Sequence, residues 1–90
     1  MIDYEWDEHK RAANRKKHGV EFAIAENFVW ESAILIEDDR IDYGETRYRA
    51  MGLIGIHIYA LVFTMRGNTV RVISLRKATR QEKKDYDKNR

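Results

Sequence analysis

Basic side chains and a histidine are grouped in short segments of this chain, and these segments contain its candidates for chemistry. They are "NRKKHG" (14–19), "RVISLRK" (71–77) and "GETRYR" (44–49). An imidazole can take and give a proton near neutral pH. Guanidinium is a planar fork of donors that suits phosphate and cannot act as a base at pH 7. The residue types therefore predict acid–base chemistry on a phosphate.

One reaction needs only such groups, if Lys17, His18 and the arginines converge. RNA carries its own nucleophile, the 2′-OH. A base removes its proton, the oxygen attacks the adjacent phosphorus, cations stabilise the added negative charge, and an acid protonates the leaving 5′ oxygen. The products are a 2′,3′-cyclic phosphate and a 5′-OH. The sequence thus predicts an endoribonuclease that works without a metal.

Each segment also has a structural interpretation. Lys17 and His18 would complement the dipole at the end of a helix. Arg71 and Arg76 could form ion pairs with Glu37, Asp38, Asp39 or Glu45, and Glu45 could pair with Arg47.

The alternative function is a non-catalytic binding module whose basic face docks an acidic protein partner. The double substitution of His18 and Arg76 to Ala separates the two functions, because only an enzyme would lose RNA cleavage while keeping its partner. Direct DNA recognition is disfavoured, since no helix-turn-helix recognition helix is evident.

Metal and cofactor sites are not predicted. His9, His18 and His57 have no ligand spacing, and the chain has no cysteine. The run "EDD" (37–39) cannot direct three consecutive side chains to one ion from a strand, and "GLIG" and "RGN" are not phosphate-loop patterns.

The composition predicts one small folded domain over residues 1–90. The chain is 43% hydrophobic and 36% charged, with a net charge of +2 and a pI of about 9.0. Without cysteines there is no disulfide. The first ten residues resemble no signal peptide, and no apolar run is long enough for a membrane span. We therefore expect a cytoplasmic protein with an acidic partner.

Hydrophobic periodicity and turn residues predict the elements that position these segments. Helices are expected at 7–18, capped by Asp7 and ended by Gly19, at 21–30, and at 79–88 with the capping box Thr79–Glu82. The last helix should dock weakly, because Tyr86 is its only large apolar residue. Strands are expected at 2–6, 33–37, 46–55, 57–66 and 69–77.

This order, β-α-α-β-β-β-β-α, predicts an α+β fold in which two N-terminal helices pack on one face of a small antiparallel sheet. The "GN" turn at 67–68 predicts a hairpin. A two-residue loop would pair Arg66 with residue 69 and Thr64 with residue 71. A three-residue loop would instead put Thr64, Arg66, Ser74 and Arg76 on one face, and the sequence leaves both registers open.

The segments "YEWDEHKRAANRKKHGVEF", "GETR" and "VFTMRGNTVRVISLRKATRQEKKDY" resemble the BrnT family of bacterial toxins nearly from end to end. The specific feature is the pairing of W-D-x-x-K-x-x-x-N-x-x-K-H-G with I-S-x-R-K-A. The resemblance implies a RelE-like fold and a ribonuclease that arrests translation. It also implies a BrnA-type antitoxin that neutralises the toxin, joins it in a complex expected to be a heterotetramer, and alone contacts operator DNA.

The resemblance also implies a set of site residues. The expected catalytic residues are Lys17, His18, Arg66, Arg76 and Lys77. The expected substrate-binding residues are Ser74 and Tyr86 from the resemblance, together with Arg47 from the segment "GETRYR" (44–49). Leu75 stands where the family commonly has a small residue, which would narrow the site.

Overall fold

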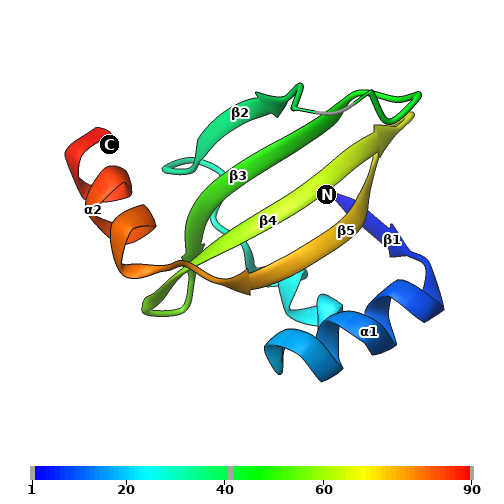
Figure 1. Ribbon diagram of the computed structural model, residues 1–90, viewed down its shortest axis with the longest axis horizontal. Helices are drawn as coiled ribbons and strands as arrows, with labels where there is room; N and C mark the ends of the chain where they lie inside the picture. The colour runs from blue at the N-terminus through cyan, green and yellow to red at the C-terminus, as the bar shows by residue number, and fades with distance from the viewer. Residues whose placement is uncertain (1, 41, 90) are drawn as a thin grey trace.

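The computed structural model describes residues 2–40 and 42–89 of the chain (Figure 1). Its elements, in chain order, are β1 (Asp3–Trp6), α1 (Glu8–His18), the 3₁₀ helix η1 (Phe22–Asn27), β2 (Ile34–Asp38), β3 (Arg47–Ile54), β4 (His57–Arg66), β5 (Thr69–Lys77) and α2 (Arg80–Asn89).

The five strands form one mixed sheet in the order β1-β5-β4-β3-β2. β2, β3, β4 and β5 are antiparallel neighbours, whereas β1 runs parallel to β5. The expectation of a small, purely antiparallel sheet is therefore wrong. A parallel neighbour requires a crossover, and the chain crosses from the β1 edge to the β2 edge through α1 and η1.

The prediction of a second N-terminal α-helix over residues 21–30 is also wrong. Residues 22–27 form a short 3₁₀ helix, and the backbone is extended again at Phe28. The Phe28 N–H donates to the Ala25 carbonyl, and the next N–H, of Val29, donates to the carbonyl of Leu53 in β3. Pairing with the sheet thus ends the helix before the apolar stripe that predicted residues 21–30 is complete. The helices lie at both ends of the chain, rather than as an N-terminal pair.

The core lies between η1 and one face of the sheet. Phe22, Ala25 and Phe28 pack with the buried side chains of the central strands, including Leu61 and Leu75. The absence of a side chain at Gly52 leaves room for the Phe28 ring, because a Cβ at Gly52 would lie 2.7 Å from that ring. Among the described residues, no such layer covers the opposite face of the sheet, which leaves room for a site.

The predicted ends of α1 and the predicted start of α2 are confirmed. The Asp7 carboxylate accepts from the Lys10 N–H at 3.0 Å, and Gly19 ends α1 with φ 70°. At the start of α2, Thr79 and Glu82 form the reciprocal capping box. None of the helices in the described residues is long and apolar enough to span a membrane.

Candidate active-site cleft

The β4–β5 hairpin combines features of both registers considered for it. The two-residue turn pairs Arg66 with Thr69 and Thr64 with Arg71, as the shorter loop predicts. A bulge follows, in which Phe63 pairs with Val72 and Val62 with Ser74.

The bulge exchanges the faces of the sheet on which the side chains in the second half of β5 lie. Ile73 is the extra residue, so side chains beyond it reverse their direction relative to an unbroken strand. Leu75 therefore enters the core, while Ser74 and Arg76 lie on the open face beside Val62 and Ala60. An irregularity in one strand thus carries two predicted site residues to the face that is free for a substrate.

Asn14 fixes α1 against this part of β5. It is the only buried residue of α1, and its side-chain amide donates to the carbonyls of Leu75 at 2.7 Å and Val20 at 3.0 Å. The Leu75 N–H donates back to Asn14 Oδ1 at 3.1 Å. β1 pairs with β5 only as far as Val72, so Asn14 replaces a strand neighbour beyond the bulge. Four residues further along the helix, His18 is thereby held at the mouth of the open face.

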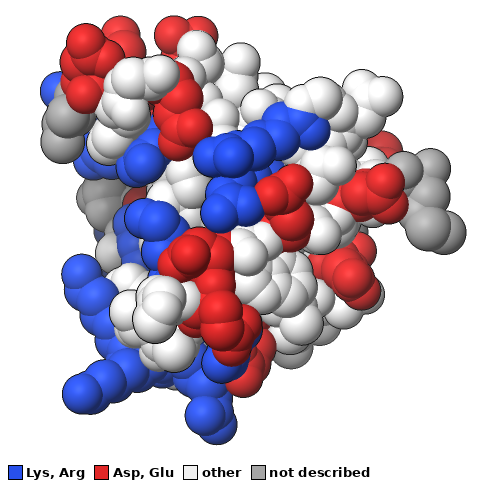
Figure 2. All heavy atoms as spheres, turned by 90° about the vertical axis from the view of Figure 1, so that its right-hand side faces the viewer, with Lys and Arg blue, Asp and Glu red and all other residues white. Residues whose placement is uncertain are grey.

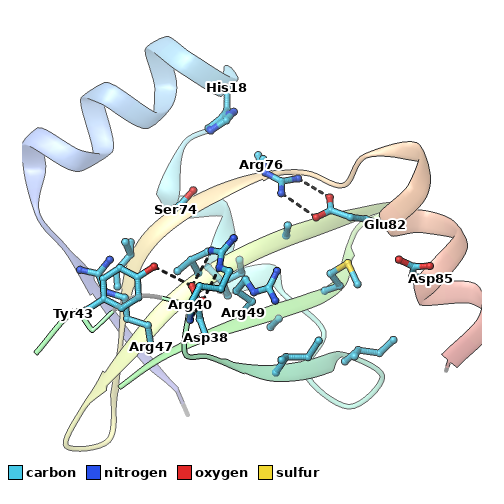
Figure 3. Close-up of a pocket in the computed structure, with 18 of the residues that line it drawn as sticks. His18, Asp38, Arg40, Tyr43, Arg47, Arg49, Ser74, Arg76, Glu82 and Asp85 are labelled. Atoms are coloured by element: carbon cyan, nitrogen blue, oxygen red, sulfur yellow. Dashed lines mark hydrogen bonds and ion pairs between the residues drawn. The ribbon is translucent and has the colours of Figure 1, made fainter. Parts of the chain in front are cut away.

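A cleft of about 570 Å³ occupies this face of the sheet (Figure 3). Its wall contains more cations than carboxylates. The cationic side chains are Lys17, Arg40, Arg47, Arg49 and Arg76, beside His18, and the carboxylates are Asp38, Glu82 and Asp85. Figure 3 shows His18 at the end of α1 above Ser74 and Arg76 of β5.

Two of the arginines at the cleft each bind both oxygens of a carboxylate. Arg76 donates to both oxygens of Glu82, at 2.6 and 3.0 Å, and these hydrogen bonds lower the pKa of Glu82 to about 2. Arg40 binds Asp38 in the same two-pronged way, at 2.8 and 3.0 Å, and lowers the pKa of Asp38 to about 2. Both carboxylates therefore stay ionised at neutral pH.

Arg49 is different from its neighbours. Its Nε is buried and makes no hydrogen bond within residues 2–40 and 42–89. Arg47, on the same face of β3, donates to Glu45 at 3.3 Å and lies over the Tyr43 ring at 3.9 Å. A buried donor without an acceptor is costly. The positive charge of Arg49 also lies close enough to Asp38 to help lower the pKa of that carboxyl.

His18 is suited to accept a proton. Burial lowers its pKa from the ordinary value of 6.5, and the positive charges of Lys17 and Arg76 lower it further. These effects favour the neutral imidazole, which has a nitrogen lone pair that can accept a proton.

The cleft thus combines a neutral imidazole with several guanidinium groups, and the comparison with protein families agrees with that chemistry. Residues 6–82 match the family described as "Ribonuclease toxin, BrnT, of type II toxin-antitoxin system". The chain belongs to this BrnT family. A search among curated proteins found no match. The BrnT match runs from Trp6 to Glu82 and so includes both walls of the cleft; it implies an RNA target and a protein antitoxin.

The cleft brings together five of the expected site residues. These are Lys17, His18, Arg47, Ser74 and Arg76. Three others lie elsewhere. Arg66 pairs with Glu45 at 3.8 Å near the hairpin turn. Lys77 is the strand partner of the core residue Tyr59, so it is on the other face.

Tyr86 is the clearest departure from the expected substrate-binding set. Its side chain is 1% exposed, and its hydroxyl donates to the Ser32 carbonyl at 3.0 Å. The expected weak docking of α2 is revised for the same reason, since Tyr86 and the Arg76–Glu82 pair both fasten this helix. A substrate cannot reach Tyr86 in this conformation.

Sequence reasoning missed Arg49 and the carboxylate partner Glu82. Arg47, Arg49 and Met51 alternate along one predicted strand, so the signal for Arg49 was present in the same segment as Arg47. Glu82 was identified only as a helix cap, a role that it has in addition to binding Arg76.

Proposed function

We propose that this toxin cleaves RNA in the cleft without a metal ion, by attack of a 2′-OH on the adjacent phosphorus. The observation that carries the proposal is the cleft itself, whose lining brings the guanidinium groups of Arg49 and Arg76 together with His18. A phosphate in the cleft would accept hydrogen bonds from the terminal N–H groups of these arginines.

The proposed reaction uses the cleft as follows. His18 removes the 2′-OH proton, the new bond forms between O2′ and phosphorus, and the bond from phosphorus to O5′ breaks. Lys17, next to His18, gives a proton to the leaving O5′. Arg49 and Arg76 donate to the phosphate oxygens, which gain charge during attack.

The ion pair with Glu82 is compatible with this role for Arg76. Glu82 uses one N–H from each terminal nitrogen, and the Lys77 carbonyl accepts a further one from Nη1 at 3.3 Å. Guanidinium has five donors, so the Nε–H and one Nη2–H remain for a phosphate. Glu82 thus orients the Arg76 guanidinium and leaves two of its N–H donors for a phosphate.

The test is incubation of the purified, partner-free protein with labelled RNA in EDTA, beside a 2′-deoxy analogue. We expect cleavage of RNA alone, leaving 2′,3′-cyclic phosphate and 5′-OH ends. His18→Ala and Arg49→Gln should each lower the rate by about 10²-fold or more. Lys83→Gln removes a charge from the exposed side of α2 and serves as the control.

Other outcomes would contradict parts of the proposal. Cleavage restored only by a divalent cation would exclude the metal-free reaction. If free RNA stays intact, translating ribosomes are added, because a ribosome-dependent toxin would then cut. Intact RNA under both conditions, with antitoxin binding preserved, would favour the binding module.

The partner is proposed to be a BrnA-type antitoxin that forms a heterotetramer with this chain and alone contacts operator DNA. The toxin's action on RNA is proposed to arrest translation. The family description supports an antitoxin, and the cationic cleft suits an acidic protein segment. Co-expression followed by light scattering would measure the stoichiometry, with two copies of each protein expected.

A further inference from the structure

The outer strand β2 exposes apolar side chains on both of its faces. Leu35 is 56% exposed and Ile36 is 48% exposed, and successive strand residues point to opposite faces. In residues 2–40 and 42–89, β2 pairs only with β3, so its other edge carries no strand from this part of the chain. Open edges with apolar side chains invite pairing with another chain.

On the face where Leu35 lies, the apolar surface continues into a groove of about 380 Å³. Its floor includes Tyr48, Phe63 and Val70, with Trp30 and Met65 beside them. The Trp30 indole N–H is already used, because it donates to the Tyr4 hydroxyl at 2.8 Å. This groove therefore offers apolar contact and little hydrogen bonding.

On the face where Ile36 lies, the neighbouring surface is cationic. Ile36 is the strand partner of Arg49, and the cleft with its excess of cations begins there. A chain that passed along β2 would thus meet an apolar groove on one face and an excess of positive charge on the other.

We propose that β2 is the docking edge for an extended segment of the antitoxin, which adds a strand to the sheet. Its alternate side chains are apolar toward Leu35 and carboxylates toward Arg49, so docking also neutralises the cleft. The identity of this occupant rests on the proposed function, whereas the geometry of the edge does not.

The geometry distinguishes this occupant from two others. A helix laid on either face would cover Leu35 or Ile36 but not both, while an added strand lies between the two faces. A second copy of the chain, paired antiparallel through Ile36 with itself, would place two cationic clefts on one continuous face, where like charges repel.

The test measures the affinity of the cognate antitoxin, purified from a co-expressed complex, for variants of the full chain. Ile36→Asp should weaken binding by at least about tenfold more than Ile36→Lys, because only Asp repels the expected carboxylates. Leu35→Asp should also weaken binding by about tenfold or more, while its cleavage of RNA stays at the level of the unmodified chain. Ile56→Asp, on an 88% exposed turn residue, is the control.

Amide hydrogen exchange gives a readout that needs no variant. Strand addition should slow exchange in residues 34–38 when the antitoxin binds. Equal binding by all variants with unchanged exchange there would overturn the proposal. So would a dimer of the chain alone that Ile36→Asp dissociates, which would identify a second copy as the occupant. RNA cleavage by the free chain reports separately on the proposed function.

Discussion

The arginines of the cleft all carry a guanidinium group, but they differ in how many of its donors are already bound by carboxylates. Arg40 and Arg76 are bound by carboxylates through two hydrogen bonds each. Arg49 has a buried Nε that finds no acceptor in the described part of the chain. An unsatisfied buried donor costs about 1 to 3 kcal/mol. Stability alone does not favour such a group, which supports our proposal that the Arg49 guanidinium serves a phosphate in the cleft.

The protonation of His18 gives a prediction at the residue scale. Because burial, Lys17 and Arg76 all disfavour the imidazolium, its pKa lies below 6.5. A general base is active when it is deprotonated, so RNA cleavage should rise with pH to a midpoint below 6.5 and then level off. Arg76→Gln removes a positive charge, which raises the His18 pKa and moves that midpoint to higher pH.

The measurement is an NMR titration of the imidazole, compared with the pH profile of cleavage normalised to its plateau. The His18 signal is assigned by its loss in His18→Ala. A midpoint that stays in place in Arg76→Gln, or a cleavage profile that does not follow the titration, would contradict the role of His18 as the base.

At the scale of the elements, one amide side chain joins a polar helix to the bulged strand. Asn14 makes three hydrogen bonds with the backbone of Val20 and Leu75. These contacts explain how α1 docks, although Asn14 is its only buried residue. They also set the distance between the His18 end of the helix and the cleft.

Asn14→Ala should therefore lower the free energy of unfolding by about 2 to 4 kcal/mol, because buried N–H and C=O groups of Leu75 lose their partners. RNA cleavage should fall as well, even under conditions where the variant is folded, since the end of α1 is released. Urea denaturation measures the first effect. Asn27→Ala, at an exposed position, is the control. A loss below about 0.5 kcal/mol would show that Asn14 is not the anchor.

The elements that local chemistry specifies could be predicted from the sequence. The Asp7 cap, the Gly19 end, the "GN" turn and the capping box at Thr79 depend on neighbouring residues, and all four formed as expected. The strands of the hairpin, at 57–66 and 69–77, also agree.

The predictions that were wrong concern features that depend on contacts between distant segments of the chain. Residues 21–30 have a helical apolar stripe, but pairing of Val29 with β3 ends the helix early. The bulge at Ile73 occurs where β1 ends and Asn14 replaces it, which no local pattern encodes. For the same reason the family resemblance placed Tyr86 at the substrate, although α2 buries this side chain against Ser32.

At the scale of the whole molecule, the charged side chains that sum to a net charge of +2 are unevenly distributed. Outside the cleft, several arginines are paired with carboxylates of other elements. Arg71 binds Glu5 across β1 and β5, and Arg11 binds Glu21 at 2.9 Å. Figure 2 shows one side of the molecule, where basic and acidic side chains alternate rather than forming a continuous basic surface. RNA affinity should therefore depend on the cleft rather than on the overall charge.

The salt dependence of RNA binding tests this distribution. If about three cleft cations contact phosphates, log K should fall with log salt at a slope of roughly −2 for a single strand. Arg49→Gln should make the slope shallower by about 0.7, the contribution of one phosphate. Lys83→Gln changes the net charge equally but lies on the exposed side of α2, so it should leave the slope unaltered. Titration of a fluorescent 2′-deoxy analogue avoids cleavage. Equal changes in both variants would mean that overall charge, and not the cleft, holds the RNA.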